Sequence, residues 1–278
     1  MKSRAPKVAY LGPEGTFAHF IAQKRFGRNA KMLAEPTIGG VVEAVTEGRA
    51  SLGIVPIENS SGGTIFETVD LLVDEKNELV VREALSLNVR LALLGKDRKN
   101  IRIVYSHFAP LFHCEQWIRE HLPQAELVEQ ASTAIAAQKA AATPNAAAIG
   151  NRDSARRYGL KVLKFPIEQD VKNVTQFFVL GRRHSGAADG AKTSIVFTLR
   201  NRPGSLYDFL TPFKKENVNL TRIISRPVIG KPETYIFLAD LAGAGRQFNV
   251  KAALNEATAL AATFRNIGSY PVRKAYDS

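Results

Sequence analysis

The stretch Gly53-Ile54-Val55-Pro56-Ile57-Glu58-Asn59-Ser60-Ser61-Gly62-Gly63-Thr64-Ile65 decides the fold of this chain. It begins as a short apolar run and ends in small polar residues, and Phe66, Val69, Leu71 and Leu72 follow at helical spacing. This pattern predicts a strand, a polar loop and a helix. Such a loop presents hydroxyls and backbone N–H groups where a helix begins, which is where α/β sheets bind small anions. A polar turn that only ends a buried strand is the alternative.

Strands and helices alternate on both sides of this stretch. Strands are predicted at 8–11, 31–35 and 51–57, with helices beginning at an N-cap on Thr16 and at 38–47. This alternation predicts a parallel sheet. An extended apolar segment at 79–93 leads to a second α/β unit, with strands at 101–105, 126–129 and 146–149 and helices at 110–121, 132–142 and 152–158. After a polar loop at 170–175 the chain returns as a strand at 177–180. Two lobes joined by crossing segments leave a cleft, the expected place for a ligand.

A glycine- and alanine-rich segment separates a smaller unit from these lobes. We expect a two-lobed α/β domain at 6–183, with its second lobe at about 90–166, then a linker at 184–191 and a small domain at 192–273. The small domain is predicted to hold strands at 193–199, 219–225, 234–241 and near 269, with helices at 206–213 and 250–264. This β-α-β-β-α-β order is that of the ferredoxin-like sandwich.

The composition of the chain indicates where the protein is located and what kind of partner it binds. The 278 residues are 45% hydrophobic, and no apolar run approaches the length of a membrane span. The single cysteine, Cys114, excludes an intrachain disulfide framework, and the N-terminus lacks the pattern of a signal peptide, so a cytoplasmic protein is expected. The net charge of +12 is spread along the chain. A small acidic metabolite is therefore the expected partner, rather than nucleic acid or a membrane, and a charge that serves only solubility is the alternative.

The residues that bear chemistry exclude several classes of site. The histidines lack zinc spacing, and neither Gly-x-x-x-x-Gly-Lys-Ser/Thr nor Gly-x-Gly-x-x-Gly occurs, so no metal and no nucleotide cofactor are expected. Hydroxyl, amide and imidazole groups remain at the predicted strand ends, namely Thr16, Asn59, Ser60, Ser106, His113 and Thr175. Such groups hold anions and donate protons over short distances, although capping and turn formation are alternative roles for each.

Taken together, these stretches resemble prephenate dehydratase. Residues 12–17 are similar to the opening motif of the family, and residues 53–72 to its most specific motif. Ser106-His107 and Ser132-Thr133 follow at family spacing, and Asn173-Val174-Thr175-Gln176-Phe177 stands where the family has Asn-x-Thr-Arg-Phe. The small domain is similar to the regulatory ACT domain, with 201–206 and 225–227 in the place of its phenylalanine-binding loops. The resemblance covers nearly the whole chain.

The resemblance implies a two-lobed catalytic domain of the periplasmic-binding-protein type. It implies a carbon–oxygen lyase without a cofactor, which converts prephenate to phenylpyruvate in phenylalanine biosynthesis, under feedback regulation by phenylalanine, as a homodimer or dimer of dimers. The implied catalytic residues are Thr175, as hydrogen-bond or proton donor to the leaving hydroxyl, with Asn59 and Ser106. The implied substrate contacts are Thr16, Glu58, Ser60, Gly63, His113, Gln176 and Phe177. The implied phenylalanine contacts are Asn201, Pro203, Gly204, Ser205, Leu206, Ser225, Arg226 and Pro227.

Three positions depart from the family pattern. Gln176 replaces the arginine that follows the catalytic threonine, His113 replaces a glutamine, and Ile224 replaces the glutamate before Ser-Arg-Pro. Loss of a charged donor to a carboxylate costs about 1.5–3 kcal/mol, so Gln176 predicts weakened activity rather than none. The sequence leaves open whether arogenate is accepted and whether phenylalanine regulation persists.

Two other functions are compatible with the altered residues. One is a related enzyme that decarboxylates prephenate without aromatising the ring. The other is a catalytically silent protein that senses prephenate or phenylalanine, because two-lobed α/β clefts also serve as solute-binding domains.

Overall fold

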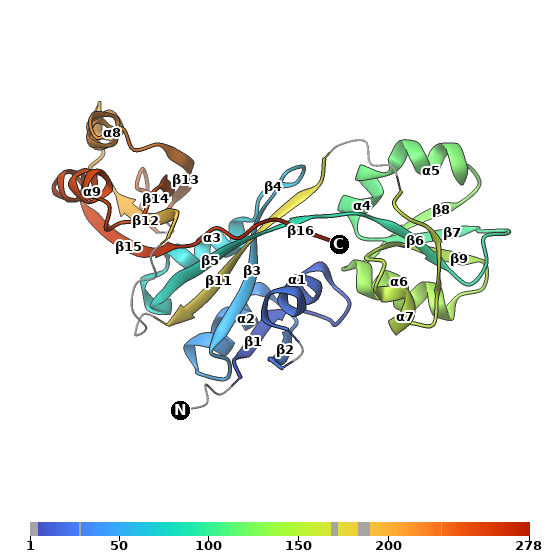
Figure 1. The fold of residues 1–278 in the computed structure, drawn as a ribbon. Coiled ribbons are helices and arrows are strands. Elements are labelled where there is room, and N and C mark those ends of the chain that lie inside the picture. Colours follow the sequence, from blue (N-terminus) through green and yellow to red (C-terminus); the bar gives the residue numbers. More distant parts are fainter. Residues whose placement is uncertain (1–4, 28, 168–171, 183–189, 229) are drawn as a thin grey trace.

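The computed structural model describes residues 5–27, 29–167, 172–182, 190–228 and 230–278. Within this part of the chain the strands form three sheets, which follow one another along an elongated molecule (Figure 1). Most of the linker expected at 184–191 lies outside the described residues, as do 170–171 of the predicted polar loop. In the described ranges, no helix is long and apolar enough to cross a membrane.

The first sheet lies in the middle of the molecule (Figure 1). Its N-terminal elements are β1 (Lys7–Leu11), α1 (Phe17–Phe26), β2 (Lys31–Glu35), α2 (Ile38–Thr46), β3 (Leu52–Asn59), β4 (Gly63–Thr64), α3 (Phe66–Val73) and the short 3₁₀ helix η1 (Glu75–Asn77). Glycine at position 53 lets α2 lie close on β3, because a Cβ there would lie 2.9 Å from side-chain carbons of both Val41 and Val45. The strands and helices predicted around this stretch are confirmed.

The predicted parallel sheet is in fact mixed. β1 pairs in parallel with β2 and β3, as expected, but β5 (Leu79–Asn88) and β11 (Val174–Arg182) run antiparallel to each other, and β11 is antiparallel to β3. Long-range pairing therefore brings the chain that returns from the second lobe back beside β3. This places residues 173–177 next to the end of the stretch that decides the fold.

The second sheet belongs to the second lobe, with strand order β10-β6-β9-β7-β8. Its elements are β6 (Ala92–Gly95), β7 (Ile103–Ser106), α4 (Phe108–His113), α5 (Glu115–His121), β8 (Glu126–Glu129), α6 (Thr133–Ala142), β9 (Ala146–Gly150), α7 (Ser154–Arg157) and β10 (Lys161–Lys164). The single helix predicted at 110–121 is wrong, because buried Cys114 leaves helical geometry (φ −118°, ψ 17°) and separates two short helices. Strand β10 was not predicted.

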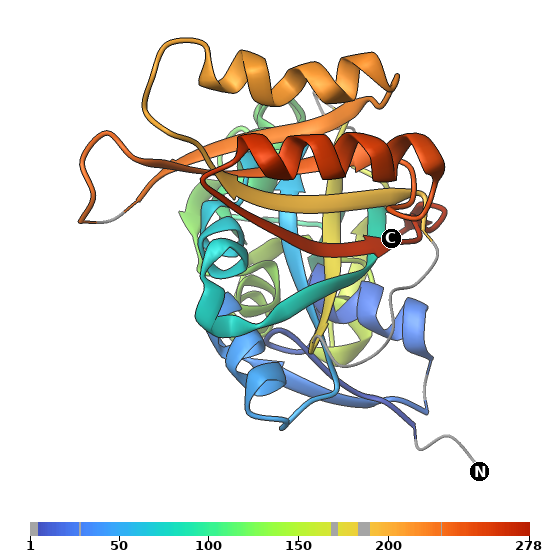
Figure 2. The same ribbon diagram turned by 90° about the vertical axis from the view of Figure 1, so that its left-hand side faces the viewer.

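The third sheet has strand order β13-β14-β12-β15 and the expected ferredoxin-like connectivity. Its elements are β12 (Lys192–Thr198), α8 (Ser205–Lys215), β13 (Leu220–Pro227), β14 (Tyr235–Ala242), α9 (Phe248–Leu260) and β15 (Thr263–Tyr270). Both helices cover one face (Figure 2), where Phe197 stacks on Phe209 with ring centroids 3.8 Å apart. The prediction that α9 reaches 264 is wrong, because Phe264 pairs with Phe197 in the sheet.

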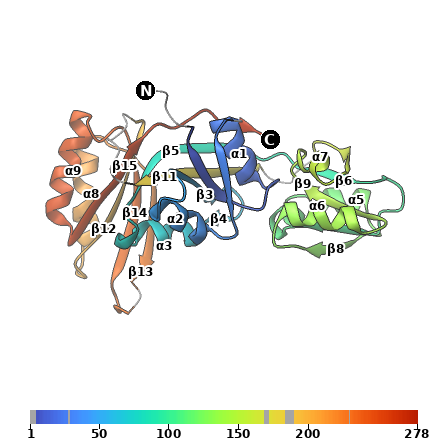
Figure 3. The same ribbon diagram turned by 90° about the horizontal axis from the view of Figure 1, so that it is seen from below.

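The other face of the third sheet packs on the first sheet. Val196, Leu238 and Tyr270 share one buried cluster with residues of α2, α3 and β3, and α3 lies against β13 and β14 (Figure 3). The close approach requires glycine at position 268, where a Cβ would lie 2.4 Å from the Val81 carbonyl oxygen of β5. The third sheet therefore packs against the face of the first sheet that contains β3 and β5.

The C-terminal segment returns to the first sheet. After β15 the chain runs along β5, where β16 (Tyr276–Asp277) pairs in parallel with Leu87 and Asn88. Glu83 of β5 accepts hydrogen bonds from both Arg25 of α1 and Arg273 of this segment. Burial raises the pKa of Glu83, but these guanidinium bonds outweigh it and hold that pKa below its ordinary value. The sequence patterns did not predict this return.

Candidate active site

A cavity of about 290 Å³ lies between the two lobes of the α/β domain. The first lobe contributes the turn before α1, the end of β3 and the start of β11, and the second lobe contributes the beginnings of α4 and α6. The described residues that line it are Leu11, Gly12, Thr16, Phe17, Ala18, Pro36, Pro56, Asn59, Val89, His107, Ala109, Pro110, Ala131, Ser132, Thr133, Asn173, Thr175 and Phe177. Four of the predicted site residues are among them, namely Thr16, Asn59, Thr175 and Phe177.

Asn59 and Thr175 form the polar centre of this cavity. They are directly paired across β3 and β11, and Asn59 Nδ2 donates to Thr175 Oγ1 at 2.9 Å and to Asn173 Oδ1 at 2.9 Å. Asn59 Oδ1 accepts from the backbone N–H groups of Ser61 and Gly62, both at 3.0 Å. These four bonds fix the amide. The Thr175 hydroxyl accepts from Asn59 and so keeps its own proton available for donation.

Thr16 begins α1 at the edge of the cavity. Its Oγ1 accepts from the backbone N–H of His19 at 3.2 Å and donates to the Leu11 carbonyl at 2.9 Å, so the predicted N-cap is confirmed. His19 Nδ1 in turn accepts from the backbone N–H of Gly15 at 3.1 Å. Burial lowers the pKa of His19, because it disfavours the charged imidazolium. The turn before α1 is therefore held by a neutral histidine.

Ser106 lies close to the cavity but does not line it. Its fully buried hydroxyl donates to the Ile149 carbonyl at 2.7 Å, a bond that ties β7 to β9. The next residue, His107, does line the cavity, and burial lowers its pKa against the opposing charge of Glu129. Ser132, another lining residue, caps α6 by accepting from the Ile135 N–H at 3.1 Å.

Sequence reasoning assigned no role to Asn173, His107 or Ser132. All three stand in stretches that resemble family motifs, and this resemblance is the signal that could have identified them. The cap on α6 brings a second helix N-terminus to the cavity, opposite that of α1. Both are positive ends of helix dipoles, with first-turn amides unused by the helix, so an anion is favoured between them.

Glu58 and Gln176 face away from this cavity. Side chains alternate along a strand, so the neighbours of Asn59 and Thr175 point to the opposite side of the sheet. There Arg222 of β13 donates through Nη2 to Glu58 Oε2 at 2.8 Å and to Gln176 Oε1 at 2.9 Å. Neither residue is among the described residues that line the cavity.

Arg222 is the centre of a buried polar network behind the site. Only 7% of its side chain is exposed, and its Nη1 donates to Asp240 Oδ2 at 2.6 Å. Asp240 Oδ1 accepts from Ser194 Oγ at 2.5 Å, which lies 2.6 Å from the Tyr270 hydroxyl. Burial, with the charge of Asp240 beside it, raises the pKa of Tyr270 well above its ordinary range. The third sheet is thus bonded to the strands that carry Asn59 and Thr175.

The remaining predicted substrate contacts, Ser60, Gly63 and His113, lie in or beside the loop that follows β3. Ser60 Oγ donates to the Lys172 carbonyl at 2.6 Å and accepts from the Val174 N–H at 2.9 Å, which fastens the end of β3 to the start of β11. Gly63 lies in β4 with φ 74°. His113 is buried, with Nδ1 3.5 Å from Ser61 Oγ. None of Ser60, Gly63 and His113 is among the described lining residues.

The predicted phenylalanine contacts fall in two segments of the third sheet. Residues 201–206 comprise the loop up to Gly204, the N-cap of α8 with φ 82°, and the first two residues of that helix. Residues 225–227 end β13, where Arg226 makes a bidentate bond to Asp70 of α3, both distances 2.6 Å, over the ring of Phe66. Strand β13 therefore contacts the first lobe at two arginines, Arg222 and Arg226.

The chain matches two family models. Residues 8–185 match "Prephenate dehydratase" and residues 193–258 match "ACT domain". A bifunctional chorismate mutase/prephenate dehydratase of Pseudomonas aeruginosa is 35% identical over 268 residues, covering 95% of this chain and 73% of that protein. A prephenate dehydratase of Lactococcus lactis is 32% identical, covering 96% and 98%. The structure of the Arthrobacter aurescens prephenate dehydratase in complex with L-Phe is 30% identical, with a TM-score of 0.87 and coverage of 95% and 90%.

Proposed function

Because the chain belongs to the prephenate dehydratase family, we propose that it is a lyase that converts prephenate to phenylpyruvate, carbon dioxide and water. The supporting observation is the bonded pair of Asn59 and Thr175 in the cavity between the lobes. The bond from the ring to its carboxylate breaks, and its electron pair completes the aromatic ring. Hydroxide leaves the opposite ring carbon and is protonated to water.

Thr175 serves this reaction as donor to the departing hydroxyl. Asn59 fills one acceptor position of the Thr175 oxygen, which turns the hydroxyl proton toward the cavity. Proton transfer by a positioned side chain contributes roughly 10²–10⁴ in rate. The helix N-termini of α1 and α6 hold the two carboxylates, and His107 lines the cavity beside them.

The polar network around Arg222 gives a role to the glutamine at position 176, which accepts a hydrogen bond from Arg222. The family arginine is absent at position 176, but the guanidinium of Arg222 from the third sheet binds β3 and β11 on the face away from the cavity. Residue 176 thereby couples the ACT domain to the strand that carries Thr175. We infer that L-phenylalanine, bound by residues 201–206 and 225–227, regulates turnover through β13, which also carries Arg226 against α3.

We keep the domain limits expected from the sequence as a proposal, namely 6–183 and 192–273 with a linker at 184–191. Residues 276–277, beyond these limits, pair with the first sheet as β16. We propose a cytoplasmic homodimer that pairs along the ACT domains. Strand β13 is an edge strand of its sheet, and Ile223 of β13 and Tyr235 of the neighbouring β14 are 45% and 49% exposed. Apolar side chains on an edge strand favour a protein partner.

The decisive experiment is incubation of the purified protein with prephenate at neutral pH, with identification of the product. Phenylpyruvate supports the proposed function. A non-aromatic decarboxylated keto acid would assign the reaction to a prephenate decarboxylase, and measurable binding with unaltered prephenate would assign a sensor. The same assay with arogenate tests whether the amino acid is also accepted.

A further inference from the structure

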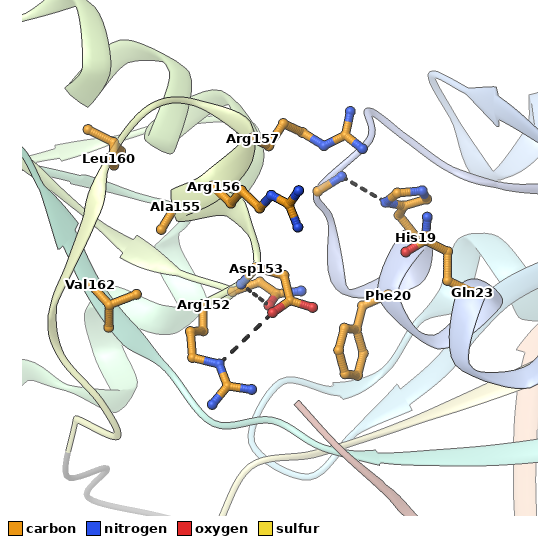
Figure 4. A pocket seen from close by; sticks show the side chains of 12 residues that line it. His19, Phe20, Gln23, Arg152, Asp153, Ala155, Arg156, Arg157, Leu160 and Val162 are labelled. Carbon is orange, nitrogen blue, oxygen red and sulfur yellow. Dashed lines mark hydrogen bonds and ion pairs between the residues drawn. The ribbon is translucent and has the colours of Figure 1, made fainter. Parts of the chain in front are cut away.

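A second, larger cavity of about 850 Å³ lies between α1 of the first lobe and α7 of the second (Figure 4). It is lined by Gly15, His19, Phe20 and Gln23 on one side and by residues of 151–162 on the other. None of the described residues that line the substrate cavity lines this one. Gly15 lines the second cavity and Thr16 the first, so the two cavities are neighbours with separate described linings.

Arginines dominate the polar lining of this second cavity. Arg152, Arg156 and Arg157 are nearly consecutive, and Arg156 and Arg157 extend across the gap toward α1 (Figure 4). Asp153 is the acidic residue among the lining, 3.9 Å from Arg152, and Arg157 pairs with Glu14 outside it. In the described part of the chain, Arg156 has no acidic partner within ion-pair distance. The cavity therefore carries an excess of positive charge.

An apolar surface adjoins these guanidinium groups. Phe20 of α1 lines the cavity opposite Leu160 and Val162 (Figure 4). Val162 is the exposed residue of the three at 42%, whereas Phe20 and Leu160 are 6% and 7% exposed. Guanidinium groups recognise carboxylates and phosphates through paired hydrogen bonds, and an apolar wall selects a ligand with a hydrophobic body. The volume lies within the range of small-molecule sites.

The position of the cavity links its ligand to both lobes. Ser154 Oγ donates to the Gly15 carbonyl and Tyr158 OH to the Glu14 carbonyl, both at 3.0 Å, so α7 already holds the turn that ends at Thr16. A ligand that bridges α7 and α1 contacts this turn at Gly15, whereas the first cavity contacts it at Gly12 and Thr16. We propose that this cavity binds a small organic anion, an apolar body bearing a phosphate or carboxylate group, separately from the substrate.

Calorimetry on the whole protein at low salt tests this site, with phenyl phosphate and phenylacetate as probes and inorganic phosphate for comparison. We expect saturable binding of an aryl anion, tighter than that of inorganic phosphate. Arg156→Gln should weaken it by about tenfold or more, since it removes a charge-assisted bond. Val162→Glu should also weaken it, because it places a like charge in the wall. Whichever probe binds more tightly identifies the anionic group.

Two controls decide whether the bound anion occupies this cavity. Arg98→Gln removes an exposed arginine of the second lobe outside the cavity and should leave affinity unchanged. Thr175→Val alters the substrate cavity and should also leave it unchanged. The proposal fails if neither aryl anion binds, if inorganic phosphate binds equally well, if Arg98→Gln matches Arg156→Gln, or if Thr175→Val abolishes binding while Arg156→Gln does not.

Discussion

Arg222 of strand β13 donates a hydrogen bond of 2.9 Å to Gln176, the residue that follows Thr175 in β11. This bond joins the C-terminal sheet to the strand that carries the proposed proton donor. The same guanidinium also binds Glu58, which precedes Asn59. One side chain of the C-terminal sheet thus binds a chain neighbour of each of the two polar residues of the site, Asn59 and Thr175.

Exchange of the two partners tests this coupling. Gln176→Arg restores the family residue but sets a second guanidinium against Arg222, so we expect turnover to fall. The double variant Gln176→Arg/Arg222→Gln should recover activity, with an interaction free energy of about 0.5–3 kcal/mol. The measurement is kcat and KM for the four proteins of the cycle. Wild-type turnover in Gln176→Arg alone would contradict the coupling.

Removal of Arg222 tests its structural contribution. Arg222→Met leaves Asp240, whose side chain is 1% exposed, beside an uncharged partner, and breaking a buried pair costs about 3–5 kcal/mol. Urea unfolding measures this loss. The matched control is Arg202→Met, which breaks the exposed pair with Asp208 and should cost less than about 1 kcal/mol. Equal losses in the two variants would argue against the buried network.

Loss of the Thr175 hydroxyl should lower turnover with prephenate. We expect Thr175→Ala to reduce kcat by about a hundredfold or more, whereas Thr175→Ser retains the hydroxyl and most of the activity. Phenylpyruvate formation gives the rate, and thermal unfolding shows whether the variants are folded. Near-wild-type turnover in a folded Thr175→Ala protein would remove this residue from the mechanism.

Acid should destabilise the fold through its buried histidines. The pKa values of His19 and His107 lie below the ordinary value of 6.5 because both are buried. Below pH 6.5 the unfolded chain therefore binds more protons than the folded chain. The free energy of unfolding consequently decreases as the pH is lowered. Above 6.5 this contribution is fully present. Urea unfolding between pH 7.5 and 5.5 measures the slope.

A variant isolates the share of His19 in this pH dependence. His19→Gln removes the titrating group, while its amide oxygen can still accept the bond from the Gly15 N–H. We expect a shallower fall in stability with decreasing pH than in the wild type. An unchanged slope would assign the effect to other groups.

Phenylalanine should bind the third sheet and lower turnover. Gly204 has φ 82°, where an L side chain costs about 1–2 kcal/mol, so Gly204→Ala should disturb the loop and weaken phenylalanine binding several-fold. Gly230→Ala is the matched control, since Gly230 has φ 77° but lies outside the two predicted binding segments. Calorimetry on the whole protein measures both. Absence of phenylalanine binding to the wild type would remove the regulatory proposal.

Local patterns were sufficient for most elements. The apolar run before Asn59 and the helical spacing after Ile65 predicted β3 and α3, and the hydroxyl of Thr16 predicted its cap, because these signals involve neighbours in the chain. The resemblance to the family was sufficient to predict that Asn59 and Thr175 share one site. The break at Cys114 was missed, because it depends on burial against the rest of the lobe.

The sequence by itself determined the α/β lobes, the ferredoxin-like unit and the polar residues at the strand ends. Only the tertiary structure decided that Gln176 and Glu58 point away from the cavity toward Arg222, and that residues 276–277 rejoin the first sheet. The physical reason is that strand alternation fixes which side chains share a face. The partner that covers each face is set by the docking of segments far apart in the chain.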